Sequence, residues 1–215
     1  MENQTEIFWL GHACFKIKLQ NGRNIYLDPY QLKGNEEKAD IIVSSHTHGD
    51  HFSKQDIKKI WKEGTILIGP ESIGKELEKF GGKPLRIGEI FDLNDLTIEL
   101  FPAYTIKKAT HPKSNQWTGT IITTANKKIY HAGDTERIPE MKELSKKEIT
   151  VAMLPCGGTY TMDFEEASDA ALDIKPKIVI PMHNWGKDLQ DFKKLMQKKD
   201  PEIRVEILEQ KSLKV

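Results

Sequence analysis

The sequence predicts an α/β fold in which helices cover two separate β-sheets. Three observations favour it over a single doubly wound sheet. Strand-like segments outnumber what one parallel βαβ sheet requires, several are joined as hairpins, and the second half of the chain repeats the strand and helix order of the first. No linker or low-complexity tract interrupts the sequence, so we expect one domain over residues 1–215 with pseudo-symmetric halves of about 1–100 and 101–215.

The first half is rich in strands. Ser53 has the side chain of a helix N-cap, and Ile57 and Ile60 follow at helical spacing, which predicts a helix over 54–62. A second helix is expected over 71–80, before a pair of glycines. Short apolar segments bounded by turn signals predict the strands of this half at 7–10, 14–19, 24–27, 41–44, 65–68, 85–87 and 96–101.

The second half repeats this arrangement. We expect helices over 139–145, 164–174 and 188–199, the last with lysine pairs on its solvent face. The apolar residues that form the buried stripe of this last helix are Leu189, Phe192, Leu195 and Met196. The strands expected in this half are 119–124, 128–131, 150–154, 178–180 and 205–208.

The composition and net charge of the chain argue against several classes of protein. Lys plus Arg equal Asp plus Glu at 32 each, and this zero net charge argues against a protein that grips nucleic acid or an anionic membrane. The apolar runs are too short to span a bilayer, and the first residues lack a signal-peptide pattern, so we expect a cytoplasmic protein. Cys14 and Cys156 form no disulfide framework, and Cys156 has no adjacent base that would make it a nucleophile.

Three of the seven histidines lie within six residues, directly after a predicted strand. If the backbone stays extended, His46 and His48 share one side of the chain. Gly49 then permits a sharp turn, which brings Asp50 and His51 to a second position beside the first. Neutral imidazoles and a carboxylate are the ligands that zinc and similar divalent ions prefer. The spacing therefore predicts a metal site and not an ordinary polar loop.

The segment His46-Thr47-His48-Gly49-Asp50-His51 resembles the signature of the metallo-β-lactamase superfamily. The resemblance extends over nearly the whole chain and is strongest to a branch of small metal-dependent hydrolases similar to ascorbate-6-phosphate lactonase. The other segments that carry it are Trp9-Leu10-Gly11-His12-Ala13, Leu27-Asp28-Pro29-Tyr30, Ile129-Tyr130-His131-Ala132-Gly133-Asp134-Thr135, Leu154-Pro155-Cys156-Gly157-Gly158-Thr159-Tyr160-Thr161-Met162 and Ile180-Pro181-Met182-His183.

The resemblance implies a four-layer αββα sandwich with two divalent metal ions along one edge, zinc by preference and manganese or iron as alternatives. It implies that one ion is bound by His46 and His48. The second ion would be bound by Asp50, His51 and His183, and Asp134 would bridge both. From the residues alone, Asp134 and His183 each follow a predicted strand, which is also compatible with a turn aspartate and a solvated loop histidine.

The third ligand of the first ion is less evident from the sequence. Many relatives have a histidine directly after a Pro-Ala-aromatic step, but here Thr105 follows Phe101-Pro102-Ala103-Tyr104. His111 lies between the first histidine motif and Asp134, and we expect it to be a ligand or a substrate contact, with a surface histidine as the alternative.

Other polar and aromatic residues lie near the expected site. Asp28 is expected to accept a hydrogen bond from a ligand imidazole and so fix its tautomer, unless it only caps a turn before a proline. His12 either contacts a metal ligand or the substrate, or is a buried structural histidine. His131 is interpreted as structural, and Tyr160 and Trp185 as packing residues at the mouth of the site.

These features predict a metal-dependent hydrolase that attacks its substrate with a metal-bound hydroxide, with Asp50 also carrying a proton to the leaving group. A lactone or ester of a small metabolite, phosphorylated or not, is the expected substrate. The alternatives are a phosphodiesterase or nuclease, which the presence of only four arginines disfavours, and a non-catalytic metal-binding module. We expect a small-molecule partner and neither membrane nor nucleic acid, and we leave assembly into a homo-oligomer open.

Overall fold

The computed structural model describes residues 4–125, 127–209 and 211–215, and these form two compact units. Unit 1 comprises Met1–Arg86 with Leu208–Val215, and unit 2 comprises Ile87–Ile207. Each unit is built around its own seven-stranded sheet. Among the described residues no helix combines the length and the apolar composition needed to cross a membrane.

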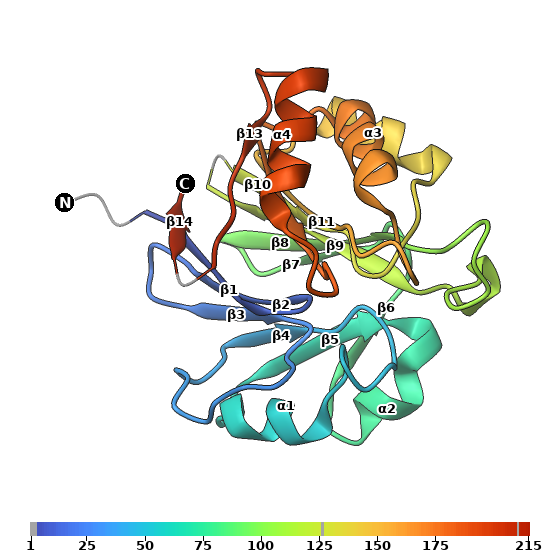
Figure 1. Cartoon of the computed structure of the whole chain (residues 1–215). Coiled ribbons are helices and arrows are strands. Elements are labelled where there is room, and N and C mark those ends of the chain that lie inside the picture. The colour runs from blue at the N-terminus through green and yellow to red at the C-terminus, as the bar shows by residue number, and fades with distance from the viewer. Residues whose placement is uncertain (1–3, 126, 210) are drawn as a thin grey trace. The chain divides into compact units, whose positions relative to one another are not determined.

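The sheet of unit 1 has the strand order β14-β1-β2-β3-β4-β5-β6 (Figure 1). The first four strands in this order pair antiparallel, and β3 to β6 pair in parallel. Helices α1 (Lys54–Ile60) and α2 (Gly74–Glu78) follow the parallel strands. The strands are β1 (Glu6–Gly11), β2 (Cys14–Lys18), β3 (Asn24–Leu27), β4 (Ile41–Val43), β5 (Ile66–Pro70), β6 (Lys83–Leu85) and β14 (Ser212–Lys214).

The sheet of unit 2 has the order β13-β12-β11-β10-β9-β8-β7 and is likewise mixed, parallel from β13 to β10 and antiparallel from β10 to β7. Helices α3 (Phe164–Ile174) and α4 (Leu189–Lys199) lie side by side in Figure 1. The strands are β7 (Ile90–Asp92), β8 (Leu96–Pro102), β9 (Thr118–Thr124), β10 (Lys127–His131), β11 (Val151–Pro155), β12 (Ile178–Met182) and β13 (Arg204–Val205).

Most of the expected helices and strands are present, but a few differ in type or length. The helix expected over 71–80 is a 3₁₀ turn, η1 (Glu71–Ile73), followed by α2. The helix expected from residue 139 is the 3₁₀ helix η3 (Pro139–Lys147), in which Met141 and Leu144 are buried, because a spacing of three matches three residues per turn. Strands β7 and β14 at the sheet edges were not expected, and β13 is only two residues long.

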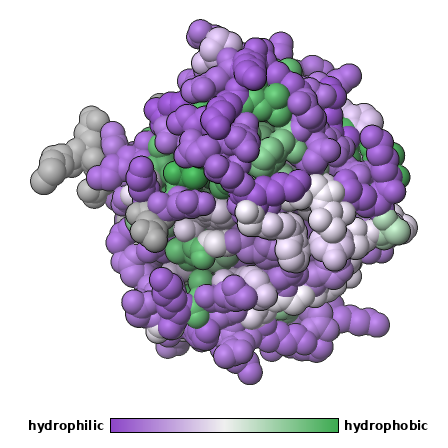
Figure 2. Space-filling view, in the orientation of Figure 1, coloured by the Kyte–Doolittle hydropathy of each residue, from purple (hydrophilic) through white to green (hydrophobic). Residues whose placement is uncertain are grey.

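The core of each unit is formed by buried apolar residues of its strands and helices. In α4 the buried side chains are Leu189, Phe192 and Met196, whereas Leu195 of the expected stripe is only partly covered. The face of the molecule in Figure 2 is mainly hydrophilic, as the 30% of charged residues requires. The central parallel strands β4, β5, β11 and β12 are almost completely buried, as expected for strands that lie beneath crossover helices, whereas the edge strands β6 and β13 are partly exposed.

Asp56 joins the start of α1 to the loop after β3. Its carboxylate accepts hydrogen bonds from the backbone N–H groups of Gln31 and Leu32 at 2.9 and 3.1 Å, and from Ser53 Oγ and Lys59 Nζ at 2.7 and 2.8 Å. Burial alone raises the pKa of Asp56, but the hydrogen bonds from Lys59, Ser53 and Gln31 outweigh burial and lower it. The ionised carboxylate therefore stabilises the folded unit.

We expect Asp56→Asn to lower the free energy of unfolding by about 2–3 kcal/mol at pH 7, because at least one buried donor loses its acceptor and the charge-assisted bonds weaken. The folded pKa lies below the unfolded value of about 3.9, so the contribution of Asp56 is present above that value and is lost as pH falls through the folded pKa. Urea unfolding of both proteins between pH 7 and pH 3 should show the difference shrinking below about pH 4. A difference that does not change with pH would contradict this account.

Candidate metal centre

In unit 1 the histidine motif follows β4 at the carboxyl edge of the parallel strands. Because β3 and β4 pair in parallel with Leu27 opposite Val43, Asp28 lies beside the start of this loop, and its N–H donates to the Val43 carbonyl at 3.0 Å. The loop folds back where the N–H groups of His51 and Phe52 both donate to the carbonyl of His48, at 2.9 and 2.8 Å. Gly49 does not adopt a positive φ in this turn, so the conformational freedom predicted for it is not used.

A buried network orients two of the histidines. Asp28 Oδ2 lies 2.7 Å from His51 Nδ1 and accepts a 2.7 Å hydrogen bond from Ser45 Oγ, while Asp28 Oδ1 accepts from the Ser45 N–H at 2.7 Å. Ser45 Oγ also lies 2.8 Å from His46 Nδ1. The Nδ1 atoms of His46 and His51 are thus both engaged by this network, so Nε2 is the nitrogen of each ring that suits a metal ion. The sequence analysis did not identify Ser45.

Asp50 and His12 are paired at the edge of this cluster. His12 Nε2 lies 2.9 Å from Asp50 Oδ2, and the His12 ring packs against His51 at a centroid distance of 5.5 Å. Burial raises the pKa of Asp50, but the hydrogen bond with His12 and the charge of His51 outweigh it and lower that pKa to about 2. The carboxylate is therefore ionised at neutral pH. His48 Nδ1 lies 3.0 Å from His46 Nε2, so ring nitrogens of these two residues converge.

In unit 2 three predicted residues meet at one carboxylate oxygen. Asp134 follows β10 and His183 follows β12, at the carboxyl edge of the parallel strands. Asp134 Oδ2 lies 3.2 Å from His111 Nε2 and 3.3 Å from His183 Nε2. All three side chains are at most 4% exposed. His111 is therefore buried beside Asp134, and the alternative of a surface histidine is wrong.

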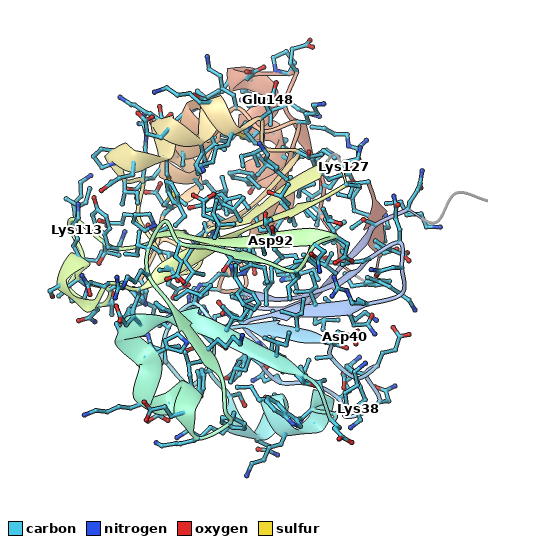
Figure 3. All side chains as sticks on the ribbon, turned by 180° about the vertical axis from the view of Figure 1, so that it is seen from behind. Lys38, Asp40, Asp92, Lys113, Lys127 and Glu148 are labelled. Atoms are coloured by element: carbon cyan, nitrogen blue, oxygen red, sulfur yellow. The ribbon has the colours of Figure 1, made fainter. Side chains whose placement is uncertain are left out.

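The loop that carries His111 is fixed by residues that the sequence analysis did not assign to the site. The Thr105 hydroxyl accepts a hydrogen bond from the His111 N–H at 3.2 Å, and the Thr105 N–H donates to the His111 carbonyl at 2.7 Å. Buried Glu136 accepts from the N–H of Lys107 and from Lys108 Nζ, at 2.7 and 2.9 Å. The same loop continues to Lys113, labelled in Figure 3, which forms an ion pair with Glu140 at 2.9 Å.

The backbone is left-handed at three of the expected site residues: His12, Asp28 and His183 have φ values of 51°, 46° and 50°. Non-glycine residues seldom adopt this conformation, which costs free energy and is found most often where function requires it. No residue pattern in the sequence signals it, because each of these positions is held by contacts from other strands. These three residues lie at the carboxyl edges of the sheets and in the β1–β2 turn, whereas other left-handed residues, such as Asn94 and Lys175, lie in turns or at helix ends away from the site.

Two residues near the cluster have other roles. His131 is buried, and its Nδ1 accepts a hydrogen bond from the Gly133 N–H at 3.2 Å, consistent with the structural role expected for it. Cys156 is buried, its Sγ lies 3.4 Å from the Met182 carbonyl, and burial raises its pKa to about 12. A thiol with this pKa remains protonated at neutral pH, so Cys156 does not act as a nucleophile.

The donor groups fit a divalent metal centre by their chemistry. Unit 1 brings together the ligand atoms of His12, Asp50 and His51, each within 4.8 Å of the others, and those of His46 and His48. Within unit 2, the imidazoles of His111 and His183 lie beside the carboxylate of Asp134. Imidazole nitrogens and carboxylate oxygens are the ligands of zinc, iron and manganese, and buried clusters of this composition are typical of metal sites.

Comparison with known proteins identifies the family. Residues 6–183 match the beta-lactamase superfamily domain. A UPF0173 metal-dependent hydrolase of Thermus thermophilus is 31% identical, with 83% of each chain covered. Two solved structures are similar: a protein of Parabacteroides distasonis (33% identity, TM-score 0.86, 94% of this chain and 92% of the other) and a metallo hydrolase of Ignicoccus hospitalis (27%, 0.82, 99% and 98%).

These similarities confirm the expected fold class, with two mixed seven-stranded sheets, flanking helices and the metallo-β-lactamase fold. They also confirm the prediction of a metal-dependent hydrolase. The match over residues 6–183 covers well over half of the chain, and the relative from Thermus thermophilus exceeds 30% identity over 83% of it. The chain therefore belongs to the UPF0173 metal-dependent hydrolase family of the metallo-β-lactamase superfamily.

Proposed function

We propose that this cytoplasmic enzyme uses two divalent ions, zinc by preference, to hydrolyse a lactone or carboxylic ester of a small metabolite. The observation that carries the proposal is the convergence of His111 and His183 on Asp134 Oδ2, at 3.2 and 3.3 Å. A carboxylate flanked by two imidazoles suits a bridging ligand, and the motif in unit 1 supplies the further nitrogen and oxygen donors that two ions require.

In this proposal His46, His48 and His111 would hold one ion, and Asp50, His51 and His183 the other, with Asp134 shared. When bound, two such ions lower the pKa of a water from 15.7 to about 7 and polarise a carbonyl oxygen. Asp28 keeps the Nε2 lone pair of His51 available by engaging its Nδ1 at 2.7 Å. Asp50 carries a proton to the leaving group and holds it only transiently, because its pKa of about 2 lies far below 7.

The ion pairs formed by the arginine side chains favour a carbonyl substrate over a phosphodiester. Arg is the usual side chain for clamping a phosphoryl group, because its planar fork matches two phosphate oxygens. Three of the four arginines instead form ion pairs with carboxylates outside the expected ligand set, namely Arg86 with Glu71, Arg137 with Asp173 and Arg204 with Glu206. The resemblance to ascorbate-6-phosphate lactonase points the same way and makes a sugar-phosphate lactone the first substrate to test.

The test is one paired panel, sugar-phosphate lactones against activated phosphodiesters, with metal-reconstituted protein and a His46→Ala control. We expect lactone hydrolysis that a chelator abolishes and that the variant lacks, together with two ions per chain by elemental analysis. Turnover of phosphodiesters alone would replace this proposal with a phosphodiesterase or nuclease. Turnover of neither class by protein that binds two ions would show that the proposed substrate class is wrong.

A further inference from the structure

Two large aromatic side chains of unit 2 are exposed beside His183. Tyr160 is 41% and Trp185 56% exposed, although the sequence analysis interpreted both as packing residues. Their rings meet edge to face with centroids 5.6 Å apart, and the Trp185 ring meets that of His183 in the same way at 5.7 Å. We call Tyr160 and Trp185 the aromatic pair. Exposed apolar surface of this kind is unfavourable in water unless a ligand covers it.

The backbone around Trp185 fixes the position of its indole, although the side chain is not buried. His183 and Trp185 both have φ values of 50°, and Gly186 follows at 75°. A Cβ at Gly157 would lie 2.4 Å from Trp185 Cδ1 and 2.5 Å from the His183 carbonyl oxygen, so only glycine allows the indole to sit there. The Asn184 side chain closes this loop by donating to the Lys187 carbonyl at 2.7 Å. The backbone is therefore strained at a position whose side chain remains largely exposed.

We infer that the aromatic pair binds a planar apolar group of the substrate while the reacting carbonyl is held at the ion next to His183. The inference rests on the proposed function and makes it more specific, because it selects esters or lactones with an aryl or similarly flat apolar substituent. Both side chains expose much of their surface, and exposed aromatic surface binds flat apolar groups by stacking. A small aliphatic lactone would not cover the pair.

The test measures binding of product-type carboxylates to the metal-loaded protein by calorimetry, with acetate and phenylacetate as the two probes. Wild-type protein should bind phenylacetate about tenfold more tightly than acetate, because a tenfold difference corresponds to about 1.4 kcal/mol, near the upper end of what an aromatic contact contributes. Trp185→Leu should remove most of this preference, measured as the ratio of the two affinities within that variant. Tyr160→Leu provides a second, independent variant and should reduce the preference less.

Trp61→Leu is the matched control, since Trp61 is a partly exposed tryptophan at the end of α1 in unit 1. This variant should retain the full preference for phenylacetate. Equal affinity of wild-type protein for both probes, or an unchanged preference in Trp185→Leu, overturns the inference and leaves the proposed ester hydrolysis intact. If neither carboxylate binds and no ester or lactone is hydrolysed by protein with two ions, both the proposed function and this inference fail.

Discussion

Asp134→Ala is expected to lower kcat/KM for hydrolysis by about a thousandfold or more, because Lewis-acid stabilisation by a metal ion contributes several kcal/mol and each 1.36 kcal/mol is a factor of ten. Asp134 Oδ2 is the atom on which His111 and His183 converge. Without it, the two proposed ligand sets would lose their common carboxylate. Elemental analysis of the purified variant should show fewer bound ions than in the wild-type protein, and steady-state assays of the best substrate should show the loss of turnover.

The matched control for this prediction is Asp191→Ala. Asp191 lies on α4, is 63% exposed and forms an ion pair with Lys194, so its loss should leave both metal content and activity unchanged. Asp134→Asn tests whether metal binding needs the charge of the carboxylate or only its shape, since an amide has similar size but is a weak metal ligand. Wild-type metal content together with full activity in Asp134→Ala would exclude Asp134 as a ligand.

Asp28→Ala should weaken metal binding by about 10–100-fold, the usual effect of removing a group that orients a metal ligand. Its carboxylate is 1% exposed and engages the Ser45 N–H, Ser45 Oγ and His51 Nδ1, all at 2.7 Å. The variant leaves these buried groups without their acceptor, so the free energy of unfolding should also fall by about 3 kcal/mol. Competition with a chelator and denaturant unfolding measure the two effects separately.

Asp28→Asn distinguishes a role of Asp28 in metal binding from a purely structural role. The amide oxygen of asparagine can still accept one hydrogen bond, so Asp28→Asn should recover part of the stability. It should recover less of the metal affinity, because a neutral amide does not raise the basicity of His51 as a carboxylate does. If Asp28→Ala loses stability but binds metal as tightly as the wild-type protein, Asp28 is a structural residue only.

The sequence predicts best what is encoded locally. Helix α3 runs from Phe164 to Ile174 as expected, because Asp163 caps it by accepting from the Glu166 N–H and Lys175 ends it in a left-handed conformation. The strand β4 and the motif after it were likewise evident, since they combine a short apolar run with a dense set of metal-binding side chains.

What depends on distant residues could not be predicted. Edge strands β7 and β14 have little apolar alternation of their own and exist because a partner strand pairs with them. The position of His111 depends on Thr105 and on Glu136, which lies 28 residues further along the chain than Lys108, its ion-pair partner. The exposure of Trp185 depends on Gly157, for which the local sequence gives no signal.

The pairing of β1 with β14 has a consequence for the order in which the chain folds. Ile7 lies opposite Leu213, and a hydrogen bond joins Glu6 and Ser212 across a separation of 206 residues. During synthesis one edge of β1 therefore stays unpaired until the whole of unit 2 has left the ribosome. An open strand edge invites pairing with other chains. β2 covers the other edge of β1, where Lys18 and Lys16 lie opposite Glu6 and Phe8, so β14 alone closes the edge that stays open.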